Sequence, residues 1–232
     1  MRVLVFSTTT GYQLRSFGEA AEKLGVELAF ATDRCKGLDD PWQDAAVPVR
    51  FYDEEGSLAR LRTAVAERPV DGIVVVGDRA VRLAACAAEM LRLRGNPPDA
   101  AWASANKKAA RERFAAAGLP TPWFVEVPEK GDEGVRAAVR YPCVVKPLGL
   151  SGSRGVIRVN DRTELDEAIP RVRALLARAD IRTMRTGLDD TMLIEQYIDG
   201  PEFAIEGVLT DGVFQPFAIF DKPDPLEGPF FE

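Results

Sequence analysis

Short apolar runs alternate with helical patterns through the first part of the chain. Four of these runs are predicted as buried strands, because they are brief and bounded by turn residues: Arg2–Phe6, Val26–Ala31, Val47–Phe51 and Val70–Val76. Helices are predicted between them, one ending at Leu24 before Gly25, one over Ser57–Arg68 with a serine cap, and one over Arg79–Leu93. This alternation predicts an α/β domain with a parallel sheet and crossover helices over residues 1–103.

A turn-forming segment then separates two regions with different patterns of predicted helices and strands. Gly95-Asn96-Pro97-Pro98 interrupts the pattern, and an alanine-rich helix is expected over Ser104–Ala117. Ser104 is its predicted N-cap, and Gly118 its stop. We interpret residues 104–122 as a linker helix between two domains.

The second half has the pattern of an α+β fold with antiparallel pairing. Its predicted strands are Trp123–Val127, Cys143–Lys146, Val156–Val159, Met192–Gln196, Glu202–Leu209 and Val213–Phe220. Helices are expected over Glu133–Arg140 and from Asp161, where Glu164 completes a variant of the capping box. Asp211-Gly212 between the last two strands predicts a tight hairpin turn.

The composition of the chain excludes several classes of function. Thirty-six acidic residues against 30 basic ones give a net charge of −6, and there is no Lys/Arg run for a nucleic-acid surface. The apolar runs are far shorter than the roughly 20 residues of a membrane span. Three widely spaced cysteines fit a reducing, cytoplasmic setting. Histidine is absent, which excludes a Ser–His–Asp hydrolase and a histidine-ligated zinc site.

The most informative motif is a strand that ends in a lysine and is followed by a glycine- and serine-rich loop. Lys146 ends the strand, and Gly149–Gly155 follows with the backbone and hydroxyl donors that can surround phosphate oxygens. The loop is neither a P-loop nor a dinucleotide fingerprint. Taken alone, it is equally compatible with a plain turn.

Two further patterns lie on either side of this loop. Glu195 and Glu202 flank an Asp-Gly-Pro turn, where a strand edge can read adenine and a carboxylate can accept ribose hydroxyls. Lys107 and Arg111 share one side of the linker helix, being four residues apart. Each pattern by itself is also compatible with solvated surface residues.

The order and spacing of these patterns resemble the ATP-grasp superfamily, which includes D-alanine–D-alanine ligase, biotin carboxylase and the L-amino-acid ligases. The resemblance runs from Asn106-Lys107 to the end of the chain. It implies a lid subdomain over residues 123–193 and an incomplete, antiparallel C-terminal subdomain over 194–232, after the preceding α/β domain.

The resemblance implies a role for each matching residue. Lys107 and Lys146 would clamp the phosphates of ATP under a lid over Gly149–Gly155, and Glu202 would hold the ribose. Lys222 would be a catalytic contact to the γ-phosphate. The remaining nucleotide-binding residues are Ser151, Gly152, Ser153 and Gly155 in the lid, and Glu195, Gln196, Tyr197 and Ile198 around adenine.

The chain departs from the family pattern at its end. The family implies Mg²⁺ held by late carboxylates, and Glu206, Glu227 and Glu232 do not match that motif. We therefore expect a truncated chain whose metal ligands are missing.

The expected function is the ATP-binding portion of an ATP-dependent carboxylate–amine or carboxylate–thiol ligase that works through an acyl-phosphate. One alternative is a nucleotide-binding protein without catalysis. Another is a cofactor-independent binding module over residues 1–100 joined to an interaction domain. The expected partners are ATP and a small carboxylate, and a homo-oligomer is compatible with the sequence.

Overall fold

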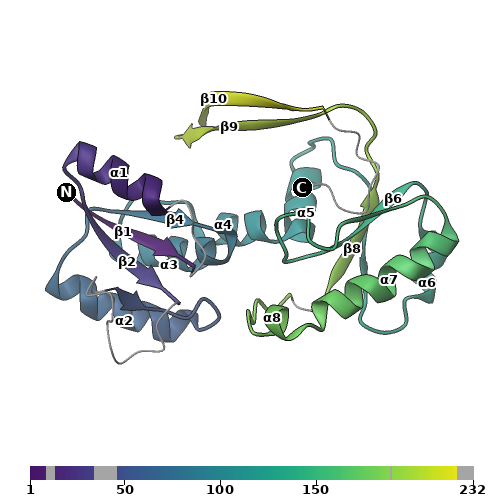
Figure 1. The fold of residues 1–232 in the computed structure, drawn as a ribbon, viewed down its shortest axis with the longest axis horizontal. Coiled ribbons are helices and arrows are strands. Elements are labelled where there is room, and N and C mark those ends of the chain that lie inside the picture. Colours follow the sequence, from purple (N-terminus) through teal and green to yellow (C-terminus); the bar gives the residue numbers. More distant parts are fainter. Residues whose placement is uncertain (9–13, 34–45, 189, 224–232) are drawn as a thin grey trace.

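A four-stranded parallel sheet forms the first domain of the computed structural model, which describes residues 1–8, 14–33, 46–188 and 190–223. Its strand order is β3-β2-β1-β4; Figure 1 labels β2, β1 and β4. The strands are β1 (Arg2–Ser7), β2 (Glu27–Thr32), β3 (Val47–Pro48) and β4 (Gly72–Val76). The helices are α1 (Leu14–Leu24), α2 (Glu54–Glu67), the 3₁₀ turn η1 (Asp78–Ala80) and α3 (Val81–Leu91). The parallel pairing confirms the predicted α/β architecture.

Two boundaries in this domain differ from the prediction for local reasons. β3 ends at Pro48 rather than Phe51, because the chain turns there and the Asp53 amide donates to the Arg50 carbonyl. Helix α2 begins at Glu54, and its N-cap is Asp53, whose carboxylate accepts from the Gly56 amide at 3.0 Å. The predicted cap, Ser57, is instead a buried residue of the first helical turn.

The two helices of the connection meet at a capped junction. Helix α4 (Pro98–Ala105) ends where α5 (Lys107–Ala116) begins. Ser104, predicted as the cap, lies inside α4 and donates to the Ala101 carbonyl. The cap is Asn106, whose buried side chain accepts from the Ala109 amide at 3.1 Å. Gly118 takes a φ of 71°, as expected for a residue just after a helix.

An antiparallel sheet in the order β5-β8-β6-β7, called the second sheet, follows this connection. Its strands are β5 (Phe124–Val127), β6 (Cys143–Pro147), β7 (Ile157–Val159) and β8 (Met192–Gln196). The accompanying helices are α6 (Glu133–Ala138), α7 (Arg162–Leu176) and α8 (Ala179–Arg182). Asp161 caps α7 as predicted, but the Glu164 carboxylate accepts from the Asn160 amide rather than from that of the cap residue.

The two faces of the second sheet differ in character because successive side chains point to opposite sides. On one, the helix face, Val145, Ile157 and Ile194 join the buried side chains of α7 in a hydrophobic core. The other, the charged face, carries Lys146 and Glu195, since Glu195 lies opposite Val144 in the register. This division determines where charge can gather.

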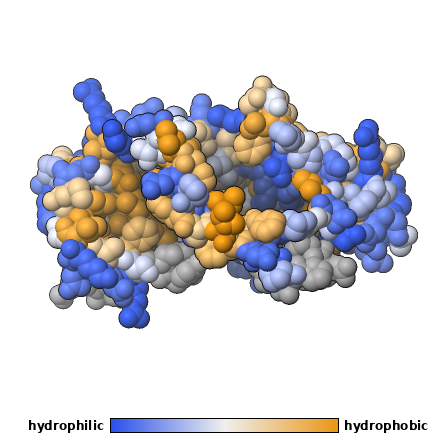
Figure 2. Space-filling model, turned by 90° about the horizontal axis from the view of Figure 1, so that it is seen from above, coloured by the Kyte–Doolittle hydropathy of each residue, from blue (hydrophilic) through white to orange (hydrophobic). Residues whose placement is uncertain are grey.

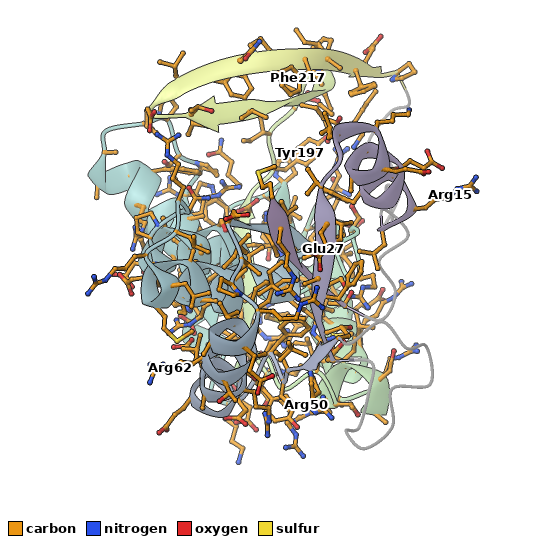
Figure 3. All side chains as sticks on the ribbon, turned by 90° about the vertical axis from the view of Figure 1, so that its left-hand side faces the viewer. Arg15, Glu27, Arg50, Arg62, Tyr197 and Phe217 are labelled. Carbon is orange, nitrogen blue, oxygen red and sulfur yellow. The ribbon has the colours of Figure 1, made fainter. Side chains whose placement is uncertain are left out.

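The last two strands form a long hairpin, β9 (Glu202–Thr210) and β10 (Val213–Lys222), which lies at the top of Figure 1 and is the outermost layer in Figure 3, where Phe217 is labelled. Asp211 and Gly212 both have positive φ, of 49° and 81°, which confirms the predicted turn. Much of the hairpin's apolar surface is exposed, including Leu209 at 68% and Ile219 at 67%. Figure 2, which views the molecule from this side, shows an orange hydrophobic area across its left and middle.

Within the described residues, no helix combines the length and apolarity that crossing a bilayer requires.

Replacing Ser57 by alanine tests the turn that leads into α2. The Ser57 hydroxyl accepts from the Arg50 amide at 2.8 Å and donates to the Arg50 carbonyl at 3.0 Å. Ser57→Ala removes the acceptor of the partly buried Arg50 amide, while the Arg50 carbonyl keeps the Asp53 amide, so we expect a loss of about 1–3 kcal/mol in the free energy of unfolding, measured in urea. Thr63→Ala on the exposed side of α2 is the control, with an expected change within about 0.5 kcal/mol. Equal losses would contradict the role of Ser57.

Candidate functional site

Helix α5 presents its first residue to the loop that follows β6. Because Asn106 fixes the start of the helix, Lys107 points across to the second sheet and its ammonium group donates to two backbone carbonyls. These are the carbonyls of Leu148, at 3.2 Å, and Leu150, at 2.5 Å. Lys107 therefore joins helix α5 to the base of the glycine- and serine-rich loop Gly149–Gly155, which we call the Gly/Ser loop.

The environment of Lys107 disfavours its charged form. Burial and, less strongly, the nearby positive charge of Lys146 lower its pKa to about 8, against the opposing effects of Asp78 and Glu195. An anion placed beside Lys107 would relieve both unfavourable effects.

Glu195 holds two cations on the charged face. Its carboxylate accepts from the Lys146 ammonium and from Nε and Nη2 of the Arg111 guanidinium, at 3.1 and 3.2 Å. Burial raises the pKa of Glu195, but the bonds and charges of Arg111 and Lys146 outweigh it, so the pKa lies below its ordinary value. Burial also lowers the pKa of Lys146, although Glu195 opposes this.

Together these residues form what we call the cation cluster: Lys107, Arg111, Lys146 and Glu195. It contains three cationic side chains and one carboxylate, so it has a positive surplus in a partly desolvated place. Arg111 is the member that the sequence prediction of site residues omitted. Its spacing of four residues from Lys107 was the available signal.

The Gly/Ser loop takes the backbone conformations that its composition allows. Gly152, Ser153 and Gly155 have φ values of 63°, 47° and 76°. At Gly155 a Cβ would lie 2.6 Å from the Leu175 side chain, so only glycine fits between the loop and α7. Ser151 and Gly152 are exposed, and the contact with the cation cluster runs through the carbonyls of Leu148 and Leu150 rather than through these residues.

The segment after Glu195 uses its first two amides within the protein. Gln196 donates to the Trp123 carbonyl at 2.9 Å and Tyr197 to the Pro142 carbonyl at 3.3 Å. The guanidinium of Arg158 lies 4.2 Å from the centre of the Tyr197 ring, labelled in Figure 3, while the Ile198 side chain is 65% exposed.

Glu202 and Lys222 are brought together at the open end of the hairpin. They lie directly opposite each other in the register, with the Lys222 ammonium 2.8 Å from the Glu202 carboxylate. The two predicted residues thus contact each other, and they are separate from the cation cluster in the described structure.

Two family models match the chain in sequence. The ATP-grasp N-terminal domain matches residues 18–95, and the ATP-grasp domain matches residues 139–232. The chain belongs to the ATP-grasp superfamily.

Relatives of this ATP-grasp chain support the assignment. The solved L-amino acid ligase from Bacillus licheniformis is 30% identical with a TM-score of 0.75, over 100% of this chain and 52% of that one. The ATP-grasp enzyme fsqD of Aspergillus fumigatus is 30% identical over 84% of this chain and 33% of its own length. A D-alanine–D-alanine ligase of Marinobacter nauticus is 40% identical over 40% of this chain and 25% of its own. The chain therefore spans about a quarter to a half of these relatives.

The ATP-grasp resemblance implies Mg²⁺, and the described side chains do not by themselves form a site that could hold it. Residues 1–8, 14–33, 46–188 and 190–223 contain no group of three His, Cys, Asp or Glu that could hold a metal ion. Glu195 and Glu202 are both paired with cations. Glu227 and Glu232 lie outside the described residues.

Removing the charge of Glu195 tests its role in the cation cluster. Glu195→Gln leaves the partly buried Lys146 and Arg111 beside each other without their counterion, so we expect a loss of about 3 kcal/mol in the free energy of unfolding, measured in urea. Glu126→Gln breaks a more exposed pair with Lys108 and serves as the control. We expect it to cost about 0–1 kcal/mol. A smaller loss for Glu195→Gln than for Glu126→Gln would contradict this role.

Proposed function

We propose that the charged face of the second sheet binds ATP through its phosphates. The observation that carries this proposal is the positive surplus of the cation cluster, in which three cationic side chains lie near the carboxylate of Glu195 and, on the side of Lys107, that of Asp78. A polyphosphate supplies the missing negative charge through charge-assisted hydrogen bonds. Lys107 and Lys146 are the proposed phosphate contacts.

The Gly/Ser loop is the proposed lid over the phosphates. Ser151, Gly152, Ser153 and Gly155 offer hydroxyl and backbone donors, and the left-handed conformations at three of these positions suit close approach to an anion. Because Lys107 holds the carbonyls at the base of this loop, the same ammonium group would contact both the lid and the nucleotide.

Adenine and ribose are proposed to lie beyond the end of β8. The Glu195–Ile198 segment would border adenine, supported by the exposed apolar side chain of Ile198. Glu202 would accept the ribose hydroxyls, and Lys222 would reach the γ-phosphate. Because these two side chains now pair with each other, nucleotide binding would replace the Glu202–Lys222 ion pair.

The proposed reaction is the joining of a small carboxylate to an amine, or to a thiol. A carboxylate oxygen would attack the γ-phosphorus and release ADP, giving an acyl-phosphate. The amine would then attack the carbonyl carbon, expel phosphate and lose a proton. The names of similar proteins, the L-amino acid ligase and the D-alanine–D-alanine ligase, support this class. The chain would contribute orientation and charge stabilisation.

Nucleotide binding without catalysis is the second candidate. The release of ADP in the presence of amino acids and Mg²⁺ separates the two candidates, because only the ligase produces it.

Lys146→Ala tests the proposed phosphate contact. We expect ATP affinity, measured by titration calorimetry, to fall by about 30- to 150-fold, corresponding to about 2–3 kcal/mol for a charged hydrogen bond. Lys108→Ala is the matched control, because Lys108 is a neighbouring cation that pairs with Glu126 outside the cluster. Unchanged affinity in Lys146→Ala, with circular dichroism showing a folded protein, would overturn the proposed site.

The lowered pKa of Lys107 predicts proton uptake on binding. With a pKa of about 8, Lys107 is partly neutral at pH 8 and recovers its proton beside a phosphate. We therefore expect ATP affinity to fall as the pH rises from 7 to 9, and calorimetry in buffers of different ionisation enthalpy to show proton uptake. Lys107→Met should remove this uptake. Proton release, or an unchanged uptake in Lys107→Met, would contradict the assignment.

A further inference from the structure

A cavity of about 380 Å³ lies between the Gly/Ser loop and the two helices that follow β7. Its size is within the range of small-molecule sites. The loop from Gly152 to Gly155 forms one wall, and residues of α7 and α8 form the other.

This cavity lies on the opposite side of the second sheet from the cation cluster. Ile157 lines it and belongs to the hydrophobic core on the helix face, together with Val145. Lys146, the next residue after Val145, points to the charged face, where it contacts Glu195. The cavity therefore shares the Gly/Ser loop with the proposed ATP site but lies on the helix face of the second sheet rather than on the charged face.

The walls of the cavity combine an apolar floor with a cationic rim. Val172, Leu175 and Ile181 join Ile157 in the floor. The rim carries three guanidinium groups and one carboxylate, from Arg154, Arg171, Arg178 and Asp180. Asp180 pairs with Arg178 at 2.9 Å, and the residues that line the cavity carry three positively charged groups and one negatively charged group.

We propose that this cavity is a binding site for a small organic anion with an apolar body, such as an aromatic carboxylate. The apolar part would cover the floor, and the carboxylate would lie at the arginine rim, where guanidinium groups favour carboxylates and phosphates. Inorganic phosphate would leave the floor uncovered. A neutral apolar compound would leave the rim without its anion.

The bound anion would contact the Gly/Ser loop on the side that faces α7. Gly152 and Gly155 line the cavity, and Gly155 packs directly against Leu175 of the floor. Occupation of the cavity therefore changes the surroundings of the loop amides as well as those of the floor methyl groups.

The experiment is a titration of the isotopically labelled full chain with 2-naphthoate, followed by NMR and without nucleotide. We expect saturable shifts of the Ile157 and Ile181 methyl signals and of the Gly155 amide. The methyl groups of Ile205 and Ile219, on the exposed hairpin, report non-specific binding to apolar surface. Because no nucleotide is present, the outcome is independent of the proposed ATP site.

Two variants separate the arginine rim from general surface charge. Arg178→Gln removes a rim cation and leaves Asp180 without its partner, so we expect affinity for 2-naphthoate to fall about tenfold. Arg182→Gln is the matched control: it is also an exposed arginine paired with an aspartate, Asp190, but lies outside the cavity. We expect its affinity to be unchanged.

Three results would overturn the proposal. The first is the absence of saturable shifts at Ile157 and Ile181 at millimolar 2-naphthoate. The second is shifts confined to Ile205 and Ile219. The third is equal affinity for the neutral 2-naphthylmethanol, because the arginine rim would then play no part in binding.

Discussion

The carboxylate of Glu195 is the interaction on which the charged face depends, because it alone stands between the Lys146 ammonium and the Arg111 guanidinium. It joins β6, β8 and α5 at one point and lets two partly buried cations remain close together. It does not balance them, and Lys107 adds a third positive charge nearby. A site that is stable enough to fold but still short of negative charge is suited to receive an anion.

The other elements of the second sheet and its helices determine where the positive charge of the cation cluster lies. Alternation along β6 directs Val145 into the core beneath α7 and Lys146 to the other side, so packing and charge use opposite faces of one sheet. Asn106 fixes the start of α5 and so aims Lys107 at the loop carbonyls. The Gly/Ser loop is seated by Gly155 against Leu175, which places the loop between the two faces and in contact with both proposed sites.

The sequence predicted what depends on local pattern and missed what depends on contacts distant in sequence. The strand over Met192–Gln196 and the turn at Asp211-Gly212 followed from periodicity and turn chemistry. Ser57 and Ser104 were wrongly assigned as caps, because serine suits both a cap and a buried turn, and only tertiary packing selects between them. Likewise, Lys107 and Lys146 were recognisable by motif, whereas no local pattern shows that Arg111 and Lys146 share Glu195, 84 and 49 residues away.

A crystal structure of the chain with a non-hydrolysable ATP analogue tests the cation cluster most directly. The expected result is phosphate oxygens at hydrogen-bonding distance, about 2.7–3.2 Å, from the ammonium nitrogens of both Lys107 and Lys146 on the charged face. A triphosphate bound elsewhere, with Lys146 still held by Glu195 alone and Lys107 still on the loop carbonyls, would contradict it.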